Sequence, residues 1–310
     1  MGGSGLPVIC FAGPTGSGKT SLALMLAERL DGEIINADSR QVYADFPLIC
    51  AQPTAEERAR APHHLYGFLA TDRKMSAGQW GDLAAGRVRQ VLERGRTPLL
   101  VGGTGMYFHA LLHGIAAIPP ADPAVSASLE ARMDAEGAPS LHAELARHDP
   151  AYAARIHPND RQRIVRALEV LQATGRPFSW WHENAMAEPL CRGPLLVLDA
   201  RLPWLEPRLA RRMDGMLAGG AMDEARRALS RCGDGRAPGW SGIGCAEAFA
   251  FLKGRINAAE CRRLWLHNTR MYAKRQITWF RGRRESVFLP PQDADAVLDA
   301  ARRLRPGELA

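Results

Sequence analysis

Short apolar runs alternate with helical patterns in the first third of the chain. Residues 7–12, 33–37 and 97–101 each have the compact apolar pattern of a buried strand. Between these runs, leucines recur at helical spacing in residues 19–30, and residues 79–94 show a helical pattern as well. The order strand, helix, strand, helix, strand predicts an α/β fold with a parallel sheet.

The middle of the chain has a different pattern. Residues 120–190 contain no convincing strand pattern, and apolar residues recur there as in short amphipathic helices, at Leu129, Met133, Leu141 and Leu145. Residues 194–198 return to the pattern of a buried strand, and from residue 206 onward the chain is helical and increasingly basic. We therefore expect two domains, an α/β core formed by residues 1–119 and 191–310, and a helical insertion at residues 120–190.

The first predicted strand leads into a glycine-rich loop of the form GxxxxGK(S/T), made by Gly13, Pro14, Thr15, Gly16, Ser17, Gly18, Lys19 and Thr20. Glycines allow backbone N–H groups to converge on phosphate oxygens, and the helix that follows adds the positive end of its dipole. Lys19 would supply a charge to the outer phosphate, and Thr20 would supply a hydroxyl to Mg²⁺. This arrangement predicts a P-loop NTPase-like core that binds a phosphate-bearing ligand.

The other strand ends carry polar residues that should meet the P-loop. Ligands of parallel sheets bind at the carboxyl ends of the strands, so we expect residues 13–20, 38–41 and 102–104 at one edge. The third strand ends in glycines and Thr104 instead of an acid that could hold Mg²⁺, which argues against a motor or switch NTPase. Asp38 could hold the metal, accept a proton from a substrate or stabilise a turn, and spacing alone leaves all three roles open.

Positive charge is concentrated near the carboxyl end of the chain. The net charge is +7, and residues 253–284 contain ten Lys or Arg and a single acid. Aromatic residues interleave with these charges, at Trp265, Tyr272, Trp279 and Phe280. The charges can follow a nucleic-acid backbone while the aromatics stack on bases or pack in the core.

A helix predicted at residues 159–171 is a second candidate for RNA contact. Its apolar residues share one face, and the other face carries Gln162, Arg163 and Arg166. Arginine suits phosphates and base edges, although a face of this composition can also simply be solvated.

Several classes of protein are disfavoured. The six cysteines are scattered without a CxxC pair, which indicates buried thiols in a reducing compartment and not a zinc site. No apolar run approaches the roughly 18 residues of a membrane span. The first residues lack the basic start and apolar centre of a signal peptide. We therefore expect a cytoplasmic protein with no membrane partner.

These motifs together resemble the tRNA dimethylallyltransferase family, bacterial type. The resemblance runs from about Val8 to Arg284, and the motifs occur in family order. They are GPTGSGKT at 13–20, ADSRQVY at 37–43, PHHLYGF at 62–68, PLLVGGTGMYFHALLHG at 98–114, ARIHPNDRQRIVRALEVLQATG at 154–175 and AKRQITWFR at 273–281.

The resemblance implies transfer of a dimethylallyl group from its diphosphate to the exocyclic amine of the adenosine 3′ to the anticodon. It implies that the P-loop holds the diphosphate with Mg²⁺, that Asp38 is the general base, and that Thr104 positions the reacting groups. The partners that it implies are dimethylallyl diphosphate and the tRNA anticodon stem-loop. We expect the protein to be a monomer. The segments that match tRNA-contacting regions contain Asp38, Ser39, Arg40, Gln41, Gln162, Arg163, Ile164, Val165, Arg166, Lys274, Arg275, Gln276 and Arg281.

Two departures from the family pattern concern single phosphate contacts. Ser126 stands where relatives often have an arginine, and Gln52 replaces a basic residue. Three other functions remain open from the residues themselves. They are a P-loop small-molecule or nucleotide kinase, a prenyltransferase acting on free adenylate, and an RNA-binding regulator that senses a nucleotide. The basic aromatic segment argues against the first two, because a small acceptor would not need it.

Overall fold

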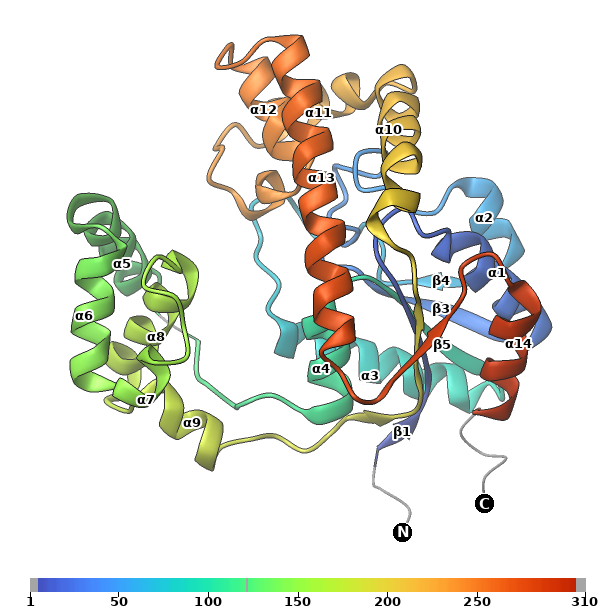
Figure 1. The fold of residues 1–310 in the computed structure, drawn as a ribbon, viewed down its shortest axis with the longest axis horizontal. Coiled ribbons are helices and arrows are strands. Elements are labelled where there is room, and N and C mark those ends of the chain that lie inside the picture. The colour runs from blue at the N-terminus through green and yellow to red at the C-terminus, as the bar shows by residue number, and fades with distance from the viewer. Residues whose placement is uncertain (1–4, 121, 305–310) are drawn as a thin grey trace. The chain divides into compact units, whose positions relative to one another are not determined.

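The computed structural model describes residues 5–120 and 122–304. The chain divides into two compact units, one made by Met1–Leu112 with Pro189–Ala310 and the other by His113–Glu188 (Figure 1). The helical unit therefore begins at His113, whereas we expected the insertion to begin at residue 120.

The larger unit is built on a six-stranded sheet in which every pairing is parallel, and the strand order is β4-β3-β5-β2-β7-β8. The predicted α/β fold with a parallel sheet is confirmed. A smaller parallel pair is formed by β1 (Leu6–Pro7) and β6 (Cys191–Arg192). The strands of the large sheet are β2 (Ile9–Ala12), β3 (Gly32–Ala37), β4 (His63–His64), β5 (Thr97–Gly102), β7 (Leu195–Leu198) and β8 (Ser286–Leu289).

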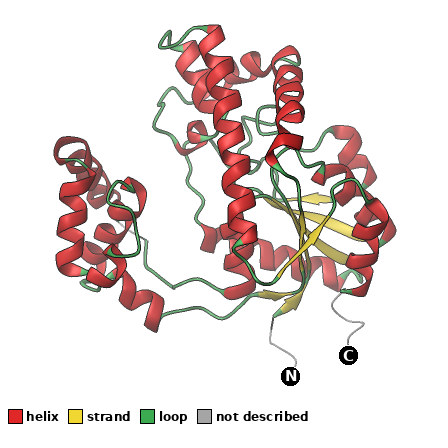
Figure 2. Cartoon of the chain, in the orientation of Figure 1, coloured by secondary structure: helices red, strands yellow, loops and turns green. Residues whose placement is uncertain are grey.

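Helices cover both faces of this sheet, as Figure 2 shows. One buried cluster packs α3 and α4 against it around Trp80 and Phe108, and the other packs α1 and α14 against it around Leu24 and Val297. The helices of this unit are α1 (Lys19–Arg29), α2 (Ala55–Arg60), α3 (Ala77–Glu93), α4 (Gly105–His113), α10 (Leu202–Ala218), α11 (Ala221–Arg231), the 3-10 turn η1 (Pro238–Ser241), α12 (Cys245–Leu252), α13 (Ala258–Arg281) and α14 (Ala294–Arg303).

Two strands of the sheet were missed by the sequence patterns. The expectation of helix throughout the last third of the chain is wrong at β8, which pairs with β7 at the sheet edge and leaves Val287 and Phe288 exposed. His63 and His64, for which the apolar patterns indicate no strand, pair with β3 as a two-residue edge strand. Strand β4 is too short and polar to contain the apolar run on which strand prediction depends, whereas β8 contains a short run, Val287–Phe288–Leu289, directly after the basic helix.

The smaller unit consists of helices in the described residues. They are α5 (Pro123–Glu136), α6 (Ala138–His148), α7 (Pro150–Ala153), α8 (Arg161–Thr174) and α9 (Phe178–Asn184). The predicted apolar positions of α5 and α6 are buried in its core beside Ile164 and Leu168. The predicted limits of α8 are confirmed, because Asp160 caps the backbone N–H of Arg163 and Gly175 ends the helix with φ of 66°.

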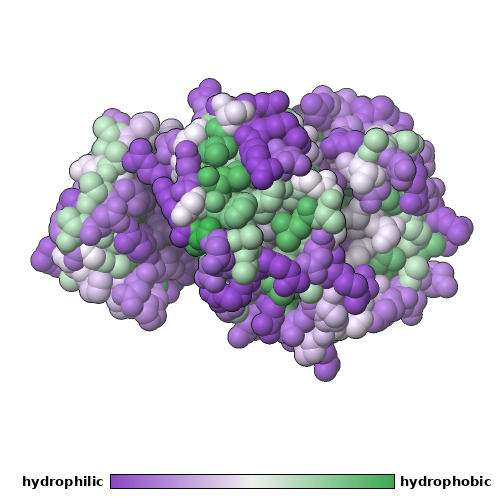
Figure 3. All heavy atoms as spheres, turned by 90° about the horizontal axis from the view of Figure 1, so that it is seen from above, coloured by the Kyte–Doolittle hydropathy of each residue, from purple (hydrophilic) through white to green (hydrophobic). Residues whose placement is uncertain are grey.

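The face shown in Figure 3 is largely hydrophilic, and apolar residues are grouped on the part of it that belongs to the larger unit. Large apolar side chains that are exposed in the described residues include Phe68, Met106 and Met271. All six cysteines are free thiols. In the part of the chain that the structure describes, none of the helices combines the length and apolar character needed to cross a bilayer.

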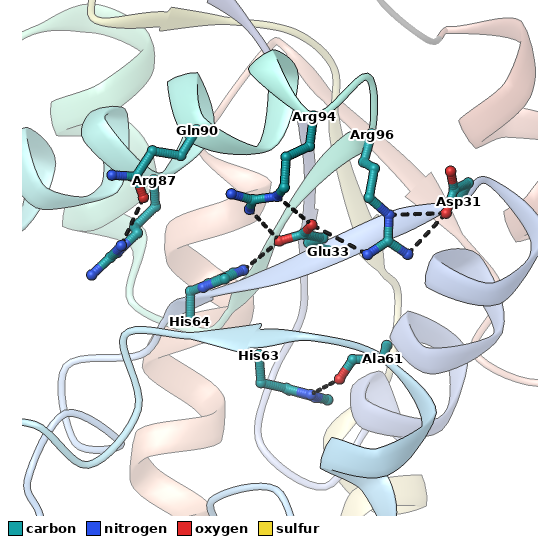
Figure 4. Close-up of polar contacts among 9 residues, drawn as sticks. All are labelled: Asp31, Glu33, Ala61, His63, His64, Arg87, Gln90, Arg94 and Arg96. Carbon is teal, nitrogen blue, oxygen red and sulfur yellow. Dashed lines mark hydrogen bonds and ion pairs between the residues drawn. The ribbon is translucent and has the colours of Figure 1, made fainter.

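A buried carboxylate fixes the beginning of β3 (Figure 4). Both oxygens of Glu33 accept hydrogen bonds from Arg94, Arg96 also donates to it, and His64 lies 2.6 Å from one of its oxygens. Burial raises the pKa of Glu33, but the hydrogen bonds and charges of Arg94 and His64 outweigh it and hold the pKa at about 2. The ionised form of Glu33 therefore stabilises the fold.

We expect Glu33→Gln to lower the free energy of unfolding at pH 7 by about 2 kcal/mol, a figure discounted because the arginines are partly exposed. The stabilisation is present above the unfolded-state pKa of about 4.5 and is lost as the pH falls through about 2, so the two proteins should converge in acid. Urea unfolding at several pH values measures this difference. Glu28→Gln, which removes an exposed ion pair with Arg60, is the control and should change little. A constant difference down to pH 2 would contradict the assignment.

Candidate active site

Three loops meet at the carboxyl edge of the large sheet. The P-loop follows β2, residues 38–41 follow β3, and residues 103–104 follow β5. Because β5 pairs in parallel with both β2 and β3, its end lies between the other two loops. The sheet therefore brings the predicted phosphate loop together with Asp38 and Thr104.

The P-loop owes its shape to glycines in the left-handed region. Gly16 and Gly18 have φ of 81° and 87°, and Gly18 immediately precedes α1. A Cβ atom at Gly16 would lie 2.7 Å from a Leu209 methyl carbon, so the loop also packs too closely for a side chain. Lys19 turns back across the loop, and its Nζ donates to the Pro14 carbonyl at 2.9 Å. The hydroxyl of Ser17 is buried and has no hydrogen-bond partner among the described residues.

The side chain of Asn36 holds Asp38 in its turn. Its Oδ1 accepts from the backbone N–H of Asp38 at 2.8 Å, and its Nδ2 donates to the carbonyl groups of Asp38 and Leu65. One carboxylate oxygen of Asp38 accepts from the backbone N–H of Arg40 at 2.8 Å. Asp38 is thus a turn carboxylate in part, but it also lines two cavities, which a purely structural role would not require.

Thr104 is attached to the Asp38 turn. Its N–H donates to the Ala37 carbonyl at 3.1 Å, and its hydroxyl accepts from the Ser39 N–H at 2.9 Å. The strands before these loops approach closely, because a Cβ atom at Gly102 would lie 2.1 Å from the Ala37 carbonyl oxygen. The loops after β3 and β5 therefore form one hydrogen-bonded assembly.

Two cavities share four lining residues, Thr15, Asp38, Cys50 and Arg212. The first is polar and includes the P-loop residues Gly16, Gly18, Lys19 and Thr20. The second has mostly apolar walls, formed by Ile49, Leu209, Met213, Met216, Ile243 and Trp265. Asp38 therefore stands where a phosphate-binding cavity adjoins one suited to apolar or aromatic groups.

Two arginines of α10 belong to this site and were not found from the sequence. Arg208 donates through Nε to the Gly16 carbonyl at 3.0 Å, and Arg212 lines both cavities. They lie four residues apart, so one face of the helix carries both. That spacing was the available signal, but the sequence does not show that α10 faces the P-loop.

The C-terminal residues that were expected to contact tRNA fall into three groups. Lys274 and Arg275 are exposed on α13, and Arg275 lies over the Tyr272 ring. Arg281 is exposed but donates to Asp199 at 2.8 Å. The prediction is wrong for the side chain of Gln276, which is 4% exposed and bonded inside the protein, so that it cannot reach a nucleic acid.

The expected contacts on α8 also need correction. Ile164 and Val165 are buried in the core of the helical unit, so their side chains cannot contact RNA. Gln162 and Arg163 are exposed. Arg166 is partly exposed and pairs with Glu169 at 3.2 Å.

Polar side chains near Asp38 mostly bind backbone. Arg40 donates to the Pro238 carbonyl and to the Ser241 hydroxyl, and Gln41 donates to the carbonyls of Cys50 and Ala51. Gln52 donates to the Tyr43 carbonyl at 2.7 Å, so this departure from the family pattern serves local structure. Ser126, the other departure, lies in the first turn of α5.

The charge of Lys19 is poised to change near neutral pH. Loss of surrounding water lowers the pKa of Lys19 to about 8, with an opposing effect from the charge of Asp38 and a further lowering by Arg212. An anion bound in the loop would favour the protonated amine. The site therefore defines a P-loop protein that holds a carboxylate beside its phosphate-binding cavity.

Comparison with known proteins identifies the family. Residues 41–283 match the family described as IPP transferase. A tRNA dimethylallyltransferase of Desulfovibrio desulfuricans is 68% identical over 296 residues, which cover 96% of this chain and 92% of that protein. One of Nitratidesulfovibrio vulgaris is 57% identical over 301 residues, covering 97% of both. This chain belongs to the IPP transferase family.

Solved structures agree with that placement. The tRNA isopentenylpyrophosphate transferase of Bacillus halodurans is 34% identical with a TM-score of 0.68, covering 96% of this chain and 95% of that one. A eukaryotic dimethylallyltransferase acting on tRNA is 27% identical with a TM-score of 0.78, covering 96% of this chain and 77% of that one.

The pKa of Lys19 predicts a pH dependence of ligand binding. Because the protonated amine is the form that attracts phosphate, affinity for dimethylallyl diphosphate without tRNA should fall about tenfold per pH unit above about 8. Calorimetric titration between pH 7 and 9.5 measures this fall. Lys19→Arg keeps its charge over that range, so its profile should be flat. A wild-type profile equally flat to pH 9.5 would show that Lys19 keeps an ordinary pKa.

Proposed function

We propose that this protein transfers the dimethylallyl group of dimethylallyl diphosphate to the exocyclic amine of the adenosine 3′ to the anticodon in tRNA. The products are N6-isopentenyladenosine and diphosphate. Membership of the IPP transferase family and 68% identity to a tRNA dimethylallyltransferase support the reaction class. The observation that carries the proposal is the position of Asp38, which lines both the P-loop cavity and the apolar cavity beside it.

The polar cavity suits the diphosphate. P-loop N–H groups, Lys19 and Arg212 surround it with donors and positive charge. As the bond from the allylic carbon to oxygen breaks, negative charge grows on the departing diphosphate. Donors already fixed in place stabilise that charge without reorganising during the reaction.

The same cavity provides a suitable oxygen ligand for Mg²⁺. The Thr20 hydroxyl lines it, and Mg²⁺ favours sites with few protein oxygens supplemented by phosphates and waters. A bound Mg²⁺ would neutralise part of the charge on the diphosphate. Thr20 is exposed, so it could reach such an ion without rearrangement of the fold.

The adjoining cavity suits the acceptor base and the prenyl chain. Its Met213, Ile243 and Trp265 walls favour a flat or branched apolar group. The adenine amine is a weak nucleophile because its lone pair is delocalised into the ring. When Asp38 accepts its proton, the nitrogen bonds to the allylic carbon and the diphosphate leaves. The base must first leave the anticodon stack, which costs a few kcal/mol.

For the tRNA backbone, the proposal assigns Lys274 and Arg275 of α13 together with Gln162 and Arg163 of α8. These side chains are exposed, and the first two make no ion pair among the described residues. One chain lines both cavities, so a monomer suffices for the reaction. A tRNA substrate places the proposed reaction in the cytoplasm.

A direct assay tests this function. The protein is incubated with labelled dimethylallyl diphosphate and unmodified tRNA, and the nucleosides are then analysed. We expect label in isopentenyladenosine at the position 3′ to the anticodon. Label on free adenylate, or steady ATP turnover without prenyl transfer, would favour the free-adenylate prenyltransferase or the kinase instead.

Replacement of Asp38 separates catalysis from binding. Asp38→Asn keeps the size of the side chain but loses the proton acceptor, so single-turnover transfer should slow by a factor of about 10² to 10⁴. Affinity for tRNA should change less than about tenfold. Transfer with enzyme in excess, measured beside tRNA binding at one salt concentration, tests both expectations.

Asn36→Ala is the matched control, because it removes the hydrogen bonds that hold the same turn while leaving the carboxylate. If Asp38 only shaped the turn, both variants would lose stability alike and Asp38→Asn would keep a near-normal rate. If Asp38 acted only as a metal ligand, higher Mg²⁺ would restore much of the lost rate. Either result would remove Asp38 as the base.

The salt dependence of tRNA binding tests the assigned cations. Lys274→Ala combined with Arg275→Ala should reduce the slope of log affinity against log salt by roughly two units, one for each lost phosphate contact. Arg270→Ala is the control on the same helix, because Arg270 is already paired with Glu206 at 3.0 Å. It should leave the slope unchanged. An unaltered slope in the double variant would show that these two charges are merely solvated.

A further inference from the structure

The side-chain amide of Gln276 joins two loops of the site. Its Oε1 accepts from the backbone N–H of Thr15 in the P-loop at 2.9 Å, and its Nε2 donates to the Gly103 carbonyl at 2.9 Å. The side chain is 4% exposed. A buried amide that satisfies a donor in one loop and an acceptor in another fixes their separation, because breaking either bond leaves a buried polar group unpaired.

The fit between α13 and the loop after β5 is close. A Cβ atom at Gly103 would lie 2.1 Å from the Gln276 amide nitrogen, and one at Gly105 would lie 2.2 Å from the Trp279 ring. One turn earlier on the helix, Tyr272 lines the apolar cavity together with Asp38. Gln276 and Trp279 follow helical spacing, so one face of α13 contacts the residues on either side of Thr104.

The cations assigned to tRNA lie directly beside Gln276 in the chain. Lys274 and Arg275 precede it and are exposed, while Arg275 also lies over the Tyr272 ring, 5.7 Å from its centroid. An RNA backbone held by these cations would restrain the same turn of α13 from which the Gln276 amide reaches both loops.

We propose that Gln276 is a positioning residue that couples tRNA binding on α13 to diphosphate binding in the P-loop. The inference rests on the proposed function only for the identity of the two ligands. When RNA restrains α13, the Gln276 amide restrains Thr15 and Gly103. The diphosphate then binds to loops whose conformational entropy has already been reduced, so its binding costs less entropy. Each ligand therefore tightens the binding of the other through the two hydrogen bonds of one amide.

The experiment measures this coupling without any chemical step. Inorganic pyrophosphate with Mg²⁺ is titrated into the full-length protein in the absence and presence of an unmodified tRNA anticodon stem-loop. The ratio of the two dissociation constants is the coupling factor. We expect the RNA to tighten pyrophosphate binding at least fivefold in the wild type, the lower end of ordinary coupling. No transfer occurs in this mixture, so the result is independent of whether the prenyl-transfer assay succeeds.

Gln276→Met is the principal variant, because it keeps the length and volume of the side chain but loses both hydrogen bonds. Its coupling factor should fall below about twofold, while affinity for the stem-loop alone changes less than about threefold. Gln276→Glu can still accept a hydrogen bond from Thr15 but cannot donate one to Gly103. It therefore tests whether the bond to the P-loop alone is enough for coupling. It should show the same loss of coupling.

Asn268→Ala is the matched control for stability. Asn268 lies on the same helix, and its amide donates to Glu247 at 2.6 Å without contacting either loop. This variant should keep the wild-type coupling factor even if its melting temperature falls. Retention of full coupling in Gln276→Met, equal loss in Asn268→Ala, or absence of coupling in the wild type would each overturn the proposal.

Discussion

Parallel pairing of β3, β5 and β2 is the constraint on which the site depends. It brings three chain reversals to one edge of the sheet, and each reversal contributes a different chemical group: N–H donors of the P-loop, the Asp38 carboxylate and the Thr104 hydroxyl. Parallel strands need a crossover between them, so these groups come from segments far apart in the sequence. The distances between these groups therefore depend mainly on the hydrogen bonds between the strands, whose lengths vary little. They depend less on side-chain rotamers, which can differ widely.

Around this edge the protein uses buried polar groups as connectors. Asn36 holds the turn of Asp38, Thr104 holds Ser39, and Gln276 joins the P-loop to the loop after β5. Each of these side chains forms a hydrogen bond with a backbone N–H or carbonyl group that has no partner within a helix or strand. Buried backbone groups need such partners. The apolar core would tolerate many packings of similar volume, whereas these connectors admit one arrangement. The apolar core therefore supports the site, and the buried hydrogen bonds of these side chains determine its geometry.

Much of this could be predicted from the sequence. The central strands, the P-loop and α8 have local signatures, because apolar runs, glycines and capping residues act on their own neighbours. The edge strand β4 could not be predicted, since its pairing comes from the neighbouring strand β3 and not from its own composition. The apolar run of β8 is short and follows a long basic helix, so the pattern did not separate it from that helix. Sequence patterns also do not show which neighbour a helix faces. The roles of Arg208 and Arg212 depend on the orientation of α10, so they were not found, and Gln276 was misassigned because its burial depends on the orientation of α13. Its neighbours Lys274 and Arg275 are exposed, and only the helical phase separates them.

Gly102 has a consequence for how sequence variation in this protein is interpreted. Gly102 is the last residue of β5, and it pairs with Ala37, the residue of β3 that precedes Asp38. The Ala37 carbonyl occupies the space that a Cβ atom of residue 102 would need. Any larger residue there would push apart the two strands whose ends carry Asp38 and Thr104. Such a change would add no charge, remove no hydrogen bond of its own and leave every ligand-contacting side chain intact. It would still alter the reaction, because the absence of a Cβ atom at Gly102 allows β3 and β5 to approach closely and so sets the distance between Asp38 and Thr104.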